Sequence, residues 1–92
     1  MRAIAEIQVI PIGSGVSVRK EVKRAHGVLA DSGLEVVLHA NGTNVEGELH
    51  RILEVIEEML ETLHAEGVAR LSTHLKIGTR TDKEPSLAGK LF

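Results

Sequence analysis

The chain has 92 residues, a formal net charge of −2, no cysteine and a single aromatic residue, Phe92. This length predicts one domain over residues 1–92, with an aliphatic core. The absence of cysteine excludes a disulfide framework and a thiolate metal site, and it fits a cytoplasmic protein. The slightly acidic charge favours neither nucleic acid nor an anionic membrane surface. No apolar run approaches the ~20 residues that cross a bilayer.

The first third of the chain predicts a strand followed by a helix. Apolar and polar residues alternate over residues 2–12, as in a strand with one buried face. A loop rich in glycine and serine follows, and Ser17 is a good candidate for the N-cap of a helix that runs to about Asp31. This helix has one apolar stripe, and Gly33 can end it in the left-handed conformation.

The stretch Leu34–Glu48 predicts a β-hairpin at the centre of the fold. We expect strands at Leu34–Ala40 and at about Thr43–Gly47. Between them lies Asn41-Gly42, and Asn-Gly between apolar runs is typical of a type I′ turn. Because both central residues of that turn need positive φ, we expect a left-handed backbone at this pair.

The last part of the chain predicts a long helix and a closing strand. The helix is expected from about Glu48 to Glu66, with Gly67 as its stop and a strand over Val68–Ile77 after it. A short turn of helix is expected near the end, over Ser86–Leu91. Seven residues form the apolar stripe of the long helix: Leu49, Ile52, Leu53, Ile56, Met59, Leu60 and Leu63.

This order of elements predicts an α+β, ferredoxin-like βαββαβ fold. Right-handed crossovers place two helices on one face of a four-stranded antiparallel sheet. The other face then has no helix to cover it, although it is neither plainly apolar nor plainly charged. Such a face suggests a second subunit, a polar small molecule, or both. Its residues are Ile4, Glu6, Gln8, Ile10, Val37, His39, Asn44, Glu46, Arg70, Ser72, His74 and Lys76.

The histidines form no recognised metal motif. None of the five is paired with another at i, i+4 around a carboxylate, as in zinc proteases. His39 and His74 fall on different predicted strands and could both face the open side of the sheet. We favour surface or interface histidines there over a metal site.

Two further features have alternative interpretations. The loop at residues 13–17 could bind an anion through backbone N–H groups at the start of a helix, or it could be a plain turn with a serine cap. Glu46 is costly on a covered sheet face unless it is paired. It could accept hydrogen bonds from an amine or aminopyrimidine ligand, or form an interface salt bridge, for which Arg70 is one possible partner.

Catalytic chemistry has little support in the sequence. No Ser-His-Asp set is indicated by spacing or by a nucleophile-elbow turn. RNA binding through a sheet face needs exposed aromatic side chains for stacking, and the predicted sheet has none. We therefore expect no catalytic residue, no metal and no cofactor.

Three segments have the spacing of one known family. Residues 11–17, PIGSGVS, are similar to Pro-Ile-Gly-Thr-x-x-Ser, and residues 42–48, GTNVEGE, to Gly-Thr-x-Ile/Val-Glu-Gly-Glu. Residues 70–77, RLSTHLKI, are similar to Arg-Val-Ser-Thr-x-Ile-Lys-Ile. The Arg-x-Asp-Lys that follows in the family is matched by Arg80, Asp82 and Lys83. Over nearly its whole length, the chain resembles the small thiamine-binding proteins with a ferredoxin-like fold, the YkoF-like group.

The resemblance implies a cytoplasmic, non-catalytic protein that binds thiamine or a related hydroxymethylpyrimidine. It also implies homo-oligomers, either sheet-to-sheet dimers or tetramers. The residue pattern adds His39 to the candidate site, from the open side of the sheet. An alternative is a structural or regulatory subunit whose sheet face serves only protein–protein association. The resemblance maps the ligand contacts onto Gly13, Ser14, Ser17, Thr43, Asn44, Glu46, Ser72 and Thr73.

Overall fold

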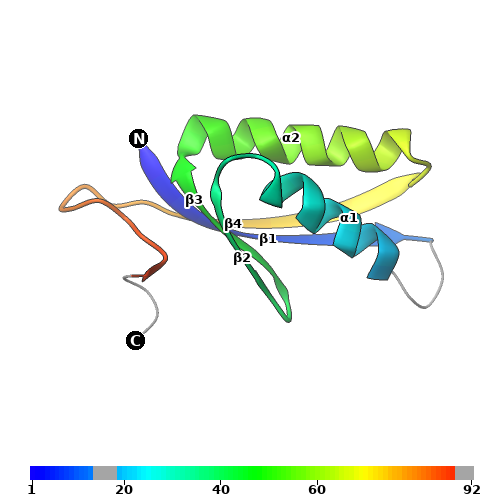
Figure 1. The fold of residues 1–92 in the computed structure, drawn as a ribbon, viewed down its shortest axis with the longest axis horizontal. Coiled ribbons are helices and arrows are strands. Elements are labelled where there is room, and N and C mark those ends of the chain that lie inside the picture. Colours follow the sequence, from blue (N-terminus) through cyan, green and yellow to red (C-terminus); the bar gives the residue numbers. More distant parts are fainter. Residues whose placement is uncertain (14–18, 89–92) are drawn as a thin grey trace.

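The computed structural model describes residues 1–13 and 19–88, and the predicted order of elements is confirmed (Figure 1). The predicted N-cap Ser17 and the end of the expected C-terminal helical turn lie outside the described residues. The elements are β1 (Arg2–Ile12), α1 (Arg19–Ala30), β2 (Glu35–His39), β3 (Gly42–Glu48), α2 (Leu49–Ala65) and β4 (Arg70–Gly78).

The strands form one antiparallel sheet in the order β2-β3-β1-β4. With two helices on one face, this is the predicted ferredoxin-like α+β fold. Figure 1 shows the long helix α2 running along the sheet, and the shorter α1 beside it. No helix among residues 1–13 and 19–88 is long and apolar enough to cross a membrane.

The core lies between the helices and the sheet, and its described residues are aliphatic apart from Met59 and the buried Thr43. Most of the predicted α2 stripe is buried, but Leu53 is wrongly placed in it, since its side chain is 46 % exposed. Val55 is fully buried instead, because it continues the face that Ile52 and Met59 define at helical spacing. The buried cluster comprises Ala3, Ala5, Ile7, Ala25, Leu29, Val45, Ile52, Val55, Ile56, Met59 and Leu63.

Glycine ends both helices, as predicted. Gly33 and Gly67 have φ of 85° and 106°, which few other residues tolerate. After α2, the amide of Val68 donates to the carbonyl of Leu63 at 3.1 Å, and the amide of Gly67 donates to that of His64 at 3.1 Å. These two bonds are those of a Schellman motif, which satisfies the last carbonyls of the helix and turns the chain into β4.

The central hairpin is confirmed, but the type I′ turn is wrong. His39 pairs with Gly42, so the two central residues are Ala40 and Asn41, and neither has positive φ. Gly42 is instead the first residue of β3. A Cβ atom there would lie 2.7 Å from the carbonyl oxygen of Ile7. Glycine is therefore needed because β1 approaches closely, rather than because the turn is left-handed.

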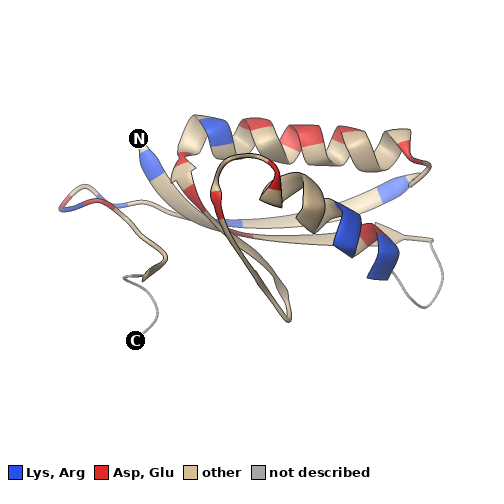
Figure 2. Ribbon diagram, viewed as in Figure 1, with Lys and Arg blue, Asp and Glu red and all other residues tan. Residues whose placement is uncertain are grey.

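Charged side chains also join the two helices. Figure 2 shows basic residues at the start of α1 and acidic residues along α2. Arg24 Nη2 lies 2.9 Å from Glu66 Oε2 at the end of α2. The hydrogen bond from Arg24, more than its charge, lowers the pKa of the Glu66 carboxyl. This pair ties the two helices together near the edge of the sheet where β4 begins.

Candidate functional site

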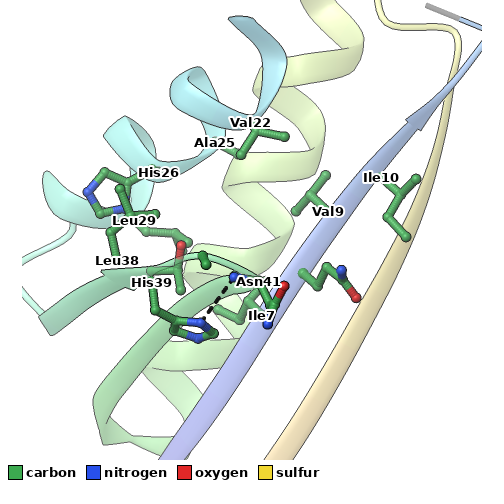
Figure 3. A pocket seen from close by; sticks show the side chains of 14 residues that line it. Ile7, Val9, Ile10, Val22, Ala25, His26, Leu29, Leu38, His39 and Asn41 are labelled. Atoms are coloured by element: carbon green, nitrogen blue, oxygen red, sulfur yellow. Dashed lines mark hydrogen bonds between the residues drawn. The ribbon is translucent and has the colours of Figure 1, made fainter. Parts of the chain in front are cut away.

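A hollow of about 230 Å³ opens between α1, β1 and the β2–β3 hairpin (Figure 3). Three parts of the chain that are distant in sequence build it, which is typical of ligand sites on rigid scaffolds. From the hairpin come residues 38–43 and from β1 residues 7–10. The contribution of α1 is Val22, Ala25, His26 and Leu29.

The lining is aliphatic apart from a few polar groups. Leu38 and Val22 are 55 % and 38 % exposed, because the hairpin extends beyond the cover of the helices. Between them the ring of His26 contributes a buried Nδ1 atom that has no hydrogen-bond partner among the described residues. A buried polar atom without a partner is costly. Because the nitrogen is covered, a ligand in the hollow can bond to it only after the His26 ring rotates toward the hollow.

His39 lies on the hairpin and contributes to the lining of the hollow. Its Nδ1 accepts a hydrogen bond from the amide of Asn41 at 3.3 Å, so this nitrogen carries no proton. The proton of the neutral ring is therefore on Nε2, which lies 3.0 Å from Oδ1 of Asn44 and 3.4 Å from Oε2 of Glu6. Both ring nitrogens are thus engaged, and the ring holds the turn rather than pointing free into the hollow.

Glu46 lies on the open face of the sheet, and both of its carboxylate oxygens are paired. Arg2 Nη2 donates to Oε2 at 3.2 Å, and the backbone amide of Leu87 donates to Oε1 at 2.7 Å. The suggested partner Arg70 is wrong. Glu46 is opposite Ile4, whereas Arg70 lies at the far end of the β1–β4 ladder. Only 13 % of the Glu46 side chain is exposed.

Neighbouring residues of β4 point to opposite faces. Ser72 is opposite Ile10 and faces the open side, with its Oγ 3.5 Å from Nε2 of His74. Thr73 is opposite Val9 and faces the helices, where its Oγ1 is buried and unpaired within the described part of the chain. These two hydroxyls therefore cannot belong to one site within a single copy of the chain.

The model of one protein family, described as thiamine-binding protein, matches residues 5–92. The chain belongs to the thiamine-binding protein family. It is 36 % identical to a UPF0045 protein of Synechocystis over 99 % of this chain and 75 % of that one. A UPF0045 protein of Methanocaldococcus jannaschii is 40 % identical over 98 % of this chain and 89 % of that one. The family resemblance seen in the sequence is thereby confirmed.

Solved structures agree with the fold of this family member. A crystal structure of a hypothetical protein from Methanocaldococcus jannaschii superposes with a TM-score of 0.90 at 40 % identity, covering 98 % of this chain and 92 % of that one. A crystal structure of a Thermotoga maritima protein, provisionally assigned to thiamine biosynthesis or salvage, superposes with a TM-score of 0.89. The two sequences are 20 % identical, and the superposition covers 99 % of this chain and 96 % of that one. At that identity the second comparison supports the fold alone.

The candidate contacts of this thiamine-binding-family protein fall into separate places. Thr43 and His39 line the hollow, and Asn44 is bonded to His39. Gly13 lies at the end of β1 with φ of 83° and is exposed. The other residues from β3 and β4 are distributed over both sheet faces, as described above. Two expected contacts lie outside the described residues: Ser14 and Ser17.

Sequence reasoning missed the α1 side of the hollow. His26 follows Val22 by four residues, so the two share one helix face next to the apolar stripe. A histidine at the edge of such a stripe is the one local signal that could have indicated a site on α1. No group of three or more metal-ligating side chains occurs in residues 1–13 and 19–88.

Proposed function

We propose that the protein is a non-catalytic, cytoplasmic binding protein for thiamine or a related hydroxymethylpyrimidine. The ligand occupies the hollow between α1 and the hairpin. The observation that carries the proposal is a mainly aliphatic hollow, beside which the buried Nδ1 of His26 has no hydrogen-bond partner among the described residues. Membership of the thiamine-binding protein family supports a small-molecule ligand of this class.

The size of the hollow favours one ring of the ligand over the whole of it. Its volume of about 230 Å³ is below the ~300–1,000 Å³ typical of sites for drug-sized molecules. The pyrimidine then lies inside against Leu38 and Leu29, and the rest of the ligand extends toward the mouth. The imidazole of His26 can exchange hydrogen bonds with the ring nitrogens and amino group of an aminopyrimidine.

Binding without turnover is the simplest role for this lining. The histidine at the hairpin is already bonded on both nitrogens, and Thr43 is only 5 % exposed. Among the described lining residues, no hydroxyl is hydrogen-bonded to a base, which an activated nucleophile would need. A binding protein needs only a hollow of suitable shape and a hydrogen bond to the ligand.

We also propose that copies of the chain associate through the open sheet face into dimers or tetramers. Val37, Ile10 and Ile12 are 49 %, 38 % and 40 % exposed on that face. Ile10 and Ile12 are neighbours on this face of β1, and an exposed apolar pair of this kind fits an interaction surface. The same observation favours the alternative function, a subunit whose open face serves only association.

Calorimetric titration with thiamine, hydroxymethylpyrimidine and their phosphates tests the ligand proposal. We expect saturable binding that His26→Leu weakens at least about tenfold, the cost of one lost hydrogen bond to a buried group. His50→Leu is the matched control, because His50 is an exposed histidine on α2, outside the hollow. Absence of heat at millimolar ligand would refute the proposal. An equal loss of affinity in both variants would show that the ligand does not bind in this hollow.

A further inference from the structure

The end of the described chain returns to the open face of the sheet. Residues 79–84 are exposed, but Pro85 is buried and Leu87 is only 8 % exposed. We call residues 84–88 the strap. Figure 1 shows this part of the chain folding back beyond the end of β4, near the N-terminus. Pro85 and Leu87 of the strap are therefore covered, whereas residues 79–84 are open to solvent.

Polar contacts of Glu46 and Arg2 fix the strap to the sheet. Glu46 accepts a hydrogen bond from the amide of Leu87 at 2.7 Å. Arg2 lies between two carboxylates, with Nη2 3.2 Å from Glu46 and Nε 3.4 Å from Glu84. Because Glu46 is mostly buried while Glu84 is 77 % exposed, the bond to Glu46 is the stronger attachment.

The strap covers one end of the open face and leaves the other end bare. Leu87 borders a cavity of about 300 Å³, which Ile4, Glu6 and Lys76 also line. Ile4 is half-buried there, whereas Ile10, on the same face of the same strand, is 38 % exposed. The open face of β1 thus has an isoleucine at each end, Ile4 beside the strap and Ile10 at the bare end, with Glu6 and Gln8 between them.

The area of the face makes the strap important for association. The β1–β4 ladder has nine registered pairs and the β2–β3 ladder five. At ~3.3 Å per residue and ~4.8 Å per strand, the two ladders present about 450 Å². A specific interface buries at least ~1,000 Å² in total, or about 500 Å² on each partner. The full face is close to this value, and a face with one end covered is well below it.

We propose that the strap competes with a second copy of the chain for the open sheet face, and that Glu46 is its attachment point. A second copy is the expected occupant because the face carries both apolar groups and interspersed charges, such as Glu6 opposite Lys76. Two such faces do not repel each other. This inference rests on the proposed sheet-to-sheet association, but not on ligand binding in the hollow.

Leu87→Asp tests the inference in the full chain, with Ala88→Asp as the matched control. Both changes add one negative charge to the strap, but Ala88 is exposed and Leu87 is buried. A buried carboxylate beside Glu46 is unfavourable, so only Leu87→Asp releases the strap. Slow amide exchange at Ile52 in the core confirms that both variants are folded.

Two measurements decide the outcome. Amide exchange by NMR should show protection at position 87 in the parent chain and in Ala88→Asp, and its loss in Leu87→Asp. Light scattering over a dilution series should then show association at least about tenfold tighter for Leu87→Asp than for Ala88→Asp. Equal or weaker association, or an unprotected amide in the parent chain, would overturn the proposal. Thiamine titration of the same variants reports on the hollow separately, and we expect it to be unchanged.

Discussion

Substitution of Gly42 tests the packing of the hairpin against β1. In Gly42→Ala the new Cβ would lie 2.7 Å from the carbonyl oxygen of Ile7, which is closer than real Cβ contacts. The position of the Cβ is fixed by the backbone of β3 and the oxygen belongs to the backbone of β1, so the strain cannot be relieved by a side-chain rotation. Overpacking of this kind costs about 1–3 kcal/mol. Alanine also lowers the conformational entropy of the unfolded chain, which stabilises the folded state by about 0.4–1 kcal/mol. We expect a net loss of about 1–2 kcal/mol in the free energy of unfolding.

Gly27→Ala is the matched control with the opposite sign. Gly27 lies inside α1, and a Cβ there would meet nothing within 4 Å. Alanine is about 1 kcal/mol more favourable than glycine in a helix interior, so this variant should be more stable than the parent. Urea denaturation gives both free energies. Thermal melts should move in opposite directions, by about 4–8 °C for each kcal/mol.

Gly42→Asn separates the two possible reasons for this glycine. If the residue were needed for positive φ, asparagine would be tolerated, because it adopts the left-handed region more readily than other residues. The close approach of Ile7 instead predicts that asparagine and alanine destabilise to a similar extent. A Gly42→Ala variant as stable as the parent chain would refute the packing argument altogether.

Three further outcomes follow from the structure. Met59→Ala should lower the free energy of unfolding by about 2–5 kcal/mol, and Leu53→Ala by much less, because Met59 is fully buried and Leu53 is 46 % exposed; similar losses in urea titrations would contradict the assigned core. The side-chain hydrogen bond from Arg80 lowers the pKa of Asp82 to about 2 from 3.8. This pair stabilises the folded tail above pH 3.8, and its contribution is lost as the pH falls through about 2. Carboxyl NMR in Arg80→Gln should show titration near 3.8, and an unchanged midpoint would exclude the pair in solution. Sheet-to-sheet association should persist in ~1 M sodium chloride, since apolar side chains anchor it, and dissociation into folded monomers there would count against it.

The elements were predictable because each depends on a period or a stop within its own segment. The α2 stripe repeats at helical spacing, and Gly33 and Gly67 end the helices through their own backbone freedom. The error at Leu53 has the same origin. Periodicity shows that a stripe exists, but its exact centre depends on where the sheet lies.

The site was less predictable because its geometry depends on contacts between distant segments. The role of Gly42 is set by Ile7, on a strand that precedes it by more than thirty residues. Likewise, the pairing of Glu46 with Leu87 requires the tail to return across the sheet. His26 becomes part of a hollow only when the hairpin extends past α1. None of these relations has a local pattern in the sequence.

The aliphatic character of the core and the hollow has a spectroscopic consequence. Phe92 is the only aromatic residue, and the chain contains neither tryptophan nor tyrosine. The protein itself is therefore almost transparent in the near ultraviolet. A heterocycle held in one orientation against chiral, non-absorbing walls would show induced circular dichroism on an empty background, so the unmodified chain can report its own occupancy without any label.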